Sequence, residues 1–192
     1  MNYQDYIWDL GGTLLDNYET STAAFVHTLQ DFGLTASHDE VYKALKVSTE
    51  YAVRQFAPRN KEFLKAYKAN EAKELEHPIL FDGASELLAQ IIQQGGRNFL
   101  ISHRDEQVLE ILQKTQIGLY FTEVVTATNG FKRKPDPESM LYLKDKYQIE
   151  SGLVIGDRPI DIEAGQVAGF SCYLFDNMKN LEEFVDIELE KE

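Results

Sequence analysis

The pattern of apolar and polar residues along the chain predicts two kinds of secondary structure. Short apolar runs that end at glycines or polar residues are typical of buried strands, and they occupy residues 3–9, 98–102, 124–126, 153–155 and 171–175. In the other segments apolar residues recur at helical spacing, which predicts helices over residues 18–32, 38–46, 48–57, 60–76, 83–94, 105–115, 136–147, 160–168 and 180–187.

Strands and helices alternate from residue 83 onward, whereas residues 18–76 contain only predicted helices. Regular alternation is typical of right-handed βαβ units, which build a parallel sheet covered by helices on both faces. The sequence therefore predicts an α/β fold with a Rossmann-like parallel sheet and an inserted small helical bundle. We expect an α/β core domain over residues 1–16 and 78–192 and a helical domain over residues 17–77.

The composition is that of a globular chain and argues against several classes of partner. With a net charge of −13, the protein lacks the excess of Lys and Arg that binds nucleic acid or an anionic membrane surface. No apolar run is long enough to span a bilayer, and the N-terminus does not resemble a signal peptide. Cys172 is the single cysteine, which fits a reducing compartment. We expect a cytoplasmic protein, and the sequence leaves its oligomeric state open.

Chemically active side chains stand where the predicted strands end. Asp9 ends the first strand, Ser102 ends the second, Lys134 follows the third, and Asp157 and Asp161 follow the fourth. Because the carboxyl ends of parallel strands meet at one edge of the sheet, we expect these side chains to lie together. Crowded carboxylates favour a cation with oxygen ligands, and Mg²⁺ is the natural candidate. A neighbouring lysine would keep a carboxylate ionised and could hold a phosphate.

These residues belong to four short motifs in a fixed order, which are Asp9-Leu10-Gly11-Gly12-Thr13, Ser102, Lys134-Pro135 and Gly156-Asp157-Arg158-Pro159-Ile160-Asp161. Together they resemble the motifs of the haloacid dehalogenase-like (HAD) hydrolase superfamily. The helical block between Asp16 and Pro78 resembles, in position and character, the small helical cap of the phosphoglycolate phosphatase and β-phosphoglucomutase branch.

This resemblance implies phosphoryl transfer through an aspartyl-phosphate. Asp9 would be the nucleophile that attacks phosphorus. Mg²⁺ would be held by Asp9, Asp157 and the backbone carbonyl of Gly11, where it would offset the repulsion between nucleophile and phosphate. Asp161 would support the metal or the lysine from close by.

The resemblance also implies how a substrate is held. Ser102 and Lys134 would position the phosphoryl oxygens, since this chemistry is mostly positioning and electrostatics. His103 and Arg104 follow in sequence and are further candidates for contact with an anionic substrate. The cap would close over the site and select a small phosphorylated metabolite.

One position departs from the family's pattern. The family's phosphatases carry a second Asp two residues after the nucleophile, which protonates the leaving group and then activates water. Here that position is Gly11, which has no side chain. General acid–base help contributes on the order of 10²–10⁴ in rate, so its loss should slow substrates with poor leaving groups most.

Four hypotheses account for Gly11. The chain could be a phosphatase for good leaving groups or one with acid–base help from elsewhere, for which His103 is the nearest candidate in sequence. It could be a phosphonatase-like hydrolase, which would need a Schiff-base lysine such as Lys43 or Lys46. It could be a dehalogenase, although Asp157 and Asp161 argue against this. It could also be a regulatory protein that binds phosphate and Mg²⁺ with little turnover.

Overall fold

The computed structural model describes residues 3–74, 76–104 and 107–185. The chain divides into two compact units, one formed by Met1–Leu15 with Leu80–Glu192 and the other by Asp16–Ile79. We call them the core unit and the helical unit and describe each by itself. Among the described residues, no helix combines the length and the apolar character needed to cross a membrane.

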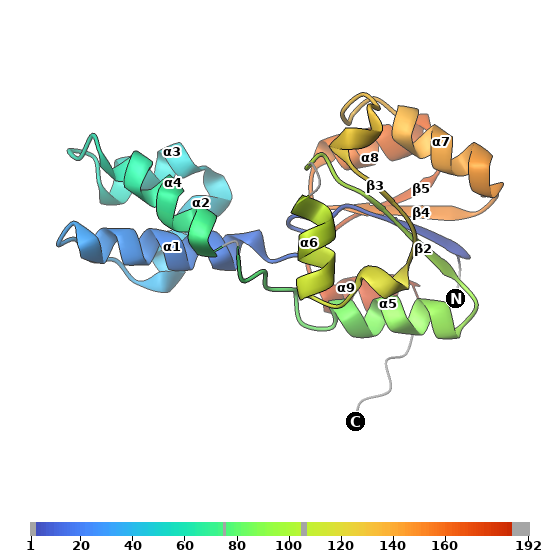
Figure 1. The fold of residues 1–192 in the computed structure, drawn as a ribbon, viewed down its shortest axis with the longest axis horizontal. Coiled ribbons are helices and arrows are strands. Elements are labelled where there is room, and N and C mark those ends of the chain that lie inside the picture. The colour runs from blue at the N-terminus through green and yellow to red at the C-terminus, as the bar shows by residue number, and fades with distance from the viewer. Residues whose placement is uncertain (1–2, 75, 105–106, 186–192) are drawn as a thin grey trace. The chain divides into compact units, whose positions relative to one another are not determined.

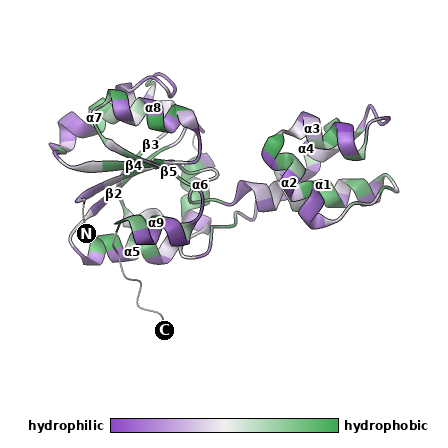
Figure 2. Cartoon of the chain, turned by 180° about the vertical axis from the view of Figure 1, so that it is seen from behind, coloured by the Kyte–Doolittle hydropathy of each residue, from purple (hydrophilic) through white to green (hydrophobic). Residues whose placement is uncertain are grey.

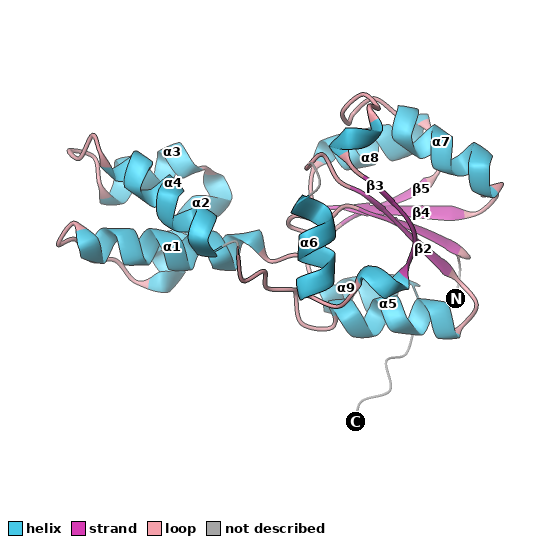
Figure 3. Ribbon diagram, viewed as in Figure 1, coloured by secondary structure: helices cyan, strands magenta, loops and turns pink. Residues whose placement is uncertain are grey.

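A parallel sheet forms the centre of the core unit (Figure 3). It has five strands in the order β3-β2-β1-β4-β5. Strand β1 lies in the middle, and its Trp8 stands opposite Leu100 on one neighbour and Ile155 on the other. This arrangement confirms the predicted α/β fold. The strands are β1 (Asp5–Trp8), β2 (Arg97–Ile101), β3 (Phe121–Val125), β4 (Gly152–Gly156) and β5 (Ser171–Leu174).

Helices cover both faces of this sheet (Figure 1). Side chains alternate between the faces of a strand, so Tyr6 and Trp8 pack in the apolar cluster of α5, α6 and α9, while Ile7 packs in that of α7 and α8. The helices are α5 (Ala84–Gln93), α6 (Gln107–Lys114), α7 (Glu138–Tyr147), α8 (Pro159–Val167) and α9 (Met178–Val185).

The observed elements differ from the predicted ones mostly at their ends. Strand β3 begins at Phe121 rather than residue 124. It is an edge strand, and its first residues include polar, partly exposed ones, so they do not form the apolar run that predicts a buried strand. Helix α9 begins earlier than predicted, and the Asn177 side chain accepts from the Asn180 N–H in its first turn. The predicted helix residues 75, 105–106 and 186–187 lie outside the described part of the chain. Two short 3-10 helices, Gly118–Tyr120 and Ala127–Asn129, were not predicted.

The described residues of the helical unit form four α-helices around an apolar core of their own. Figure 2 shows apolar and polar residues mixed along each of them. In the apolar core, Phe25 contacts Phe63 and Tyr67 at ring-centroid distances of 4.9 and 5.0 Å. The last helix begins later than residue 60 because Asn60 closes a turn by accepting from the Glu62 N–H. The helices are α1 (Asn17–Asp31), α2 (His38–Val47), α3 (Thr49–Phe56) and α4 (Phe63–Glu74).

Candidate active site

The carboxyl ends of β1 and β4 lie side by side in the sheet, which brings their following residues together. Asp9 continues β1 and donates its backbone N–H to the carbonyl of Ile155 on β4, at 2.9 Å. Asp157 follows directly after β4, and Asp161 lies in the first turn of α8. Carboxylate oxygens of Asp9, Asp157 and Asp161 lie within 4.8 Å of one another. We call these three side chains the acidic cluster.

Lys134 places an ammonium group inside the acidic cluster. Its Nζ lies 2.5 Å from Asp9 Oδ1 and also contacts Asp161 Oδ1. The residue is only 6% exposed, although it follows two exposed basic residues, Lys132 and Arg133. Burial opposes the charged ammonium, but the two carboxylates outweigh it and raise the pKa of Lys134. Lys134 therefore stays charged and neutralises part of the acidic cluster.

The three carboxylates are not equally paired. Asp161 uses both oxygens, since Oδ1 contacts Lys134 and Oδ2 accepts from the Arg158 N–H at 3.2 Å. Asp157 Oδ1 is buried and has no hydrogen-bond partner among the described residues. Burial, together with the charges of Asp9 and Asp161, raises the pKa of Asp157 to about 6. Burial also raises the pKa of Asp9, while the Lys134 ammonium opposes that rise.

A tight turn after β1 brings the backbone of Gly12 close to the side chain of Asp157. The Leu10 carbonyl accepts from the Leu14 and Leu15 N–H groups at 3.0 and 2.8 Å, and Gly12 turns the chain with a φ of +84°. A Cβ atom at Gly12 would collide with the Asp157 carboxylate. Glycine is therefore required here both for the backbone angle and for space. Gly11 lies in the same turn, where it forms an isolated bridge with Leu15.

The end of β2 supplies the other predicted site residues. Ser102 is buried, and its hydroxyl accepts from the Arg104 N–H at 3.3 Å. Arg104 and His103 are half-buried. His103 Nε2 accepts from the backbone N–H of Lys134 at 2.8 Å, so that nitrogen carries no proton. Burial and the nearby Lys134 and Arg133 charges lower the pKa of His103 to about 4.

With this geometry in place, comparison with known proteins identifies the family. The model of the family described as haloacid dehalogenase-like hydrolase matches residues 6–175. The chain belongs to the haloacid dehalogenase-like hydrolase family. That match includes all four motifs and the helical unit.

Several known proteins are similar to this chain over most of its length. A crystal structure of a hydrolase from Streptococcus pneumoniae TIGR4 is 68% identical, with a TM-score of 0.94, and the match covers 97% of this chain and all of that one. A phosphoglycolate phosphatase from Aliivibrio fischeri is 29% identical over 88% of this chain and 81% of its own. Pyrophosphatase PpaX from Oceanobacillus iheyensis is 26% identical over the same shares.

The donors in this haloacid dehalogenase-like site fit a magnesium ion. All are oxygens, which Mg²⁺ prefers. Asp157 Oδ1 is buried and has no hydrogen-bond partner in the described structure. A cation bound to this oxygen would offset the free-energy cost of burying it without a partner. Asp9 and Asp157 are the carboxylates best placed to hold the ion, because both Asp161 oxygens already have partners.

Thr13 is a further residue of interest that the sequence did not single out. It is fully buried in the turn after β1, and its hydroxyl has no hydrogen-bond partner within the part of the chain that the structure describes. Its place in the first motif, directly after Gly12, was visible in the sequence, but its burial was not.

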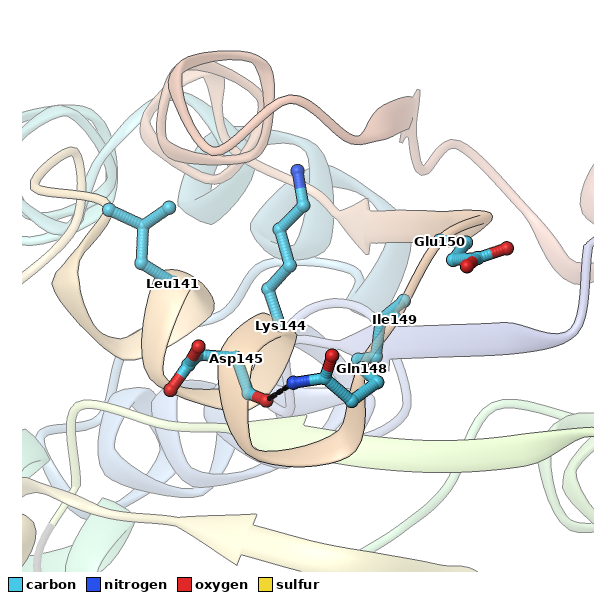
Figure 4. A pocket seen from close by; sticks show the side chains of 6 residues that line it. All are labelled: Leu141, Lys144, Asp145, Gln148, Ile149 and Glu150. Carbon is cyan, nitrogen blue, oxygen red and sulfur yellow. Dashed lines mark hydrogen bonds between the residues drawn. The ribbon is translucent and has the colours of Figure 1, made fainter.

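A pocket in the core unit lies away from these motifs. Figure 4 shows its lining, which comes from α7 and the segment that leads into β4. That segment leads into the first residue of β4, whereas Asp157 follows its last residue. The pocket and Asp157 therefore lie at opposite ends of the strand. The lining residues are Leu141, Lys144, Asp145, Gln148, Ile149 and Glu150.

We predict that Asp157→Asn stabilises the metal-free protein near neutral pH. The pKa of Asp157 is about 6 in the folded protein, above its ordinary value of 3.8. Between these values the folded protein holds a proton that the unfolded chain has released, so stability falls as the pH rises through this window. Removing the charge should raise the free energy of unfolding by about 1 kcal/mol near pH 7.5, allowing for solvent screening, and by less near pH 4.5.

Urea unfolding at both pH values, in the presence of a chelator, measures this effect. Asp145→Asn, at an exposed position on α7, is the matched control and should change little. Added Mg²⁺ should raise the melting temperature of the wild type and not that of Asp157→Asn. A variant that is less stable than the wild type near pH 7.5 would contradict this account of the acidic cluster.

Proposed function

We propose that this protein is a Mg²⁺-dependent phosphatase that acts on a small phosphorylated metabolite through an aspartyl-phosphate at Asp9. The observation that carries the proposal is the ammonium of Lys134, held between Asp9 and Asp161, beside an Asp157 Oδ1 that has no partner among the described residues. The one lysine ammonium held between Asp9 and Asp161 does not balance the charge of three carboxylates, which suits a divalent metal. The names of the phosphoglycolate phosphatase and pyrophosphatase relatives support a small phosphorylated substrate.

In the proposed reaction a carboxylate oxygen of Asp9 attacks phosphorus while the bond to the leaving oxygen breaks. The leaving group takes its proton from water, because Gly11 offers no acid. Water then attacks the phosphorus of the aspartyl-phosphate, the bond to Asp9 breaks, and inorganic phosphate leaves with release of a proton. Mg²⁺, when bound, supplies positive charge that offsets the repulsion between carboxylate and phosphate.

The other residues hold the phosphoryl group and the ion pair. Lys134 and Ser102 would contact phosphoryl oxygens, and Arg104 would contact the anionic substrate nearby. Asp161 would hold Lys134, since its oxygens are already engaged by that ammonium and by the Arg158 N–H. Gly11 would contribute its backbone carbonyl to the metal. The helical unit would act as the cap that selects the substrate.

The surroundings of the cap lysines speak against a Schiff base. Lys43 and Lys46 are both exposed on α2. The Lys46 ammonium lies over the rings of Tyr42 and Tyr18, at 5.0 and 5.7 Å from their centroids. A Schiff-base lysine is typically activated by burial in a hydrophobic pocket, whereas both of these side chains are exposed. We therefore favour the phosphatase over a phosphonatase-like reaction.

We predict Mg²⁺-dependent hydrolysis of an aryl or acyl phosphate, which a chelator abolishes and Asp9→Asn lowers by about 10³-fold or more. The amide of Asn cannot act as the nucleophile, although its size and shape are nearly those of Asp. Initial rates of phosphate release measure this, and Asp145→Asn should retain wild-type activity. Full activity in Asp9→Asn would refute the proposal. Binding of Mg²⁺ and phosphate by a wild type without turnover would point to a regulatory protein, and borohydride trapping on a lysine to a phosphonatase.

We further predict that Gly11→Asp raises the activity on alkyl phosphates by about 10-fold or more, because it supplies the missing general acid. Gly11, unlike Gly12, is not one of the glycines with a positive φ, so its backbone angle does not by itself exclude a side chain. Rates on alkyl and aryl phosphates should be compared for Gly11→Asp and for Gly11→Asn, which has the same shape without the acid.

The gain should be confined to Gly11→Asp and should be larger for alkyl than for aryl phosphates, whose leaving groups need less protonation. Gly12→Asp should lose its fold or its activity, since a Cβ there collides with Asp157. Equal rates for Gly11→Asp and Gly11→Asn in folded proteins would show that the missing acid does not limit turnover.

A further inference from the structure

The end of β2 holds Lys134 at two points. The backbone N–H of Lys134 donates to His103 Nε2 at 2.8 Å, and its Nζ lies 3.5 Å from the carbonyl of Ile101. Ser102 stands between these two contacts in sequence. Ile101, the last residue of β2, therefore contacts the ammonium of Lys134, and His103, two residues later, contacts its backbone. Ser102, which lies between them, carries the hydroxyl that we propose contacts the same phosphoryl group.

The segment around Lys134 has little regular structure to hold it in place. It lies between a 3-10 helix that ends at Asn129 and helix α7, which begins at Glu138. Its neighbouring backbone contacts are the Asp136 N–H to the Arg133 carbonyl at 3.1 Å and the Lys132 N–H to Glu138 Oε2 at 2.9 Å. Both lie to the sides of Lys134, so the His103 contact is what fixes the amide of Lys134 itself.

The chemistry of this contact determines the form of the imidazole. A backbone amide always donates, so Nε2 must accept and the ring proton must sit on Nδ1. A protonated imidazole would lose the bond and would add a positive charge beside Lys134 and Arg133. The site thus requires a neutral side chain that accepts at the position of Nε2.

We propose that His103 is a positioning residue, which holds the backbone of Lys134 so that its ammonium reaches Asp9 and Asp161. This role goes beyond the general acid–base or substrate-binding role expected from sequence, because the Nε2 nitrogen is already occupied. Its effect on turnover rests on the proposed phosphatase function, whereas the contact itself does not.

Substitutions at His103 separate positioning from proton transfer. In His103→Gln the amide oxygen can reach the place of Nε2 and accept the same hydrogen bond, but it cannot transfer a proton. In His103→Asn the shorter side chain does not reach. We expect His103→Gln to retain kcat/KM within about 3-fold and His103→Asn to lose about 10- to 100-fold, since small misplacements at a reacting centre have effects of that size. His27→Gln, on the exposed surface of α1, is the control for the residue change.

Nuclear magnetic resonance tests the contact without any turnover. In the metal-free wild type we expect a scalar coupling across the hydrogen bond between the Lys134 amide nitrogen and His103 Nε2, and nitrogen shifts typical of the Nδ1–H tautomer. We expect the exchange-protected ammonium signal of Lys134 to persist in His103→Gln and to broaden in His103→Asn. Urea unfolding of each variant shows whether it is folded.

Each outcome decides the proposal. The proposal is supported if the coupling is observed and if folded His103→Gln keeps the kcat/KM and the ammonium signal of the wild type while His103→Asn does not. An Nε2–H tautomer, a missing coupling, or equal behaviour of the two variants overturns it. If the wild type hydrolyses no phosphate ester, the proposed function fails, and the coupling and the ammonium signal still decide whether His103 positions Lys134.

Discussion

The candidate site depends on one buried ammonium, that of Lys134, which forms ion pairs with both Asp9 and Asp161. Three carboxylates within 4.8 Å would repel one another strongly, and a single lysine neutralises only part of their charge. The negative charge that Lys134 does not neutralise acts on Asp157. The buried Oδ1 of Asp157 has no partner in the described part of the chain, and its pKa is raised. Such a group destabilises the protein by itself, which is the expected condition of a site shaped for a ligand rather than for stability.

The surrounding backbone is shaped to keep this cluster together. The parallel sheet brings the ends of β1 and β4 side by side, and the absence of a side chain at Gly12 lets the turn after β1 approach Asp157. A Cβ at Gly156 would likewise collide with Asp161, so glycine there leaves room for the side chain that holds Lys134. These requirements for space explain why two glycines accompany the charged residues in their motifs.

Much of the fold was predictable from sequence because strands and helices alternate in a regular pattern, and the topology of parallel sheets then indicates which strand ends meet. The edge strand β3 was predicted too short, since its polar, partly exposed residues dilute the apolar signal. The sequence could suggest Lys134, but only the structure shows that it is buried while Lys132 and Arg133 are exposed. The contact between His103 and the Lys134 backbone joins residues far apart in the chain, so no local pattern encodes it.

The central claim is that phosphate passes through a covalent intermediate on Asp9, and the stereochemical course at phosphorus tests it most directly. A phosphate monoester made chiral with oxygen isotopes would be turned over in the presence of Mg²⁺, with transfer to an acceptor alcohol that preserves the chirality of the product. Two successive in-line displacements, one by Asp9 and one by the acceptor, predict net retention of configuration. Net inversion would mean a single direct displacement and would contradict the account.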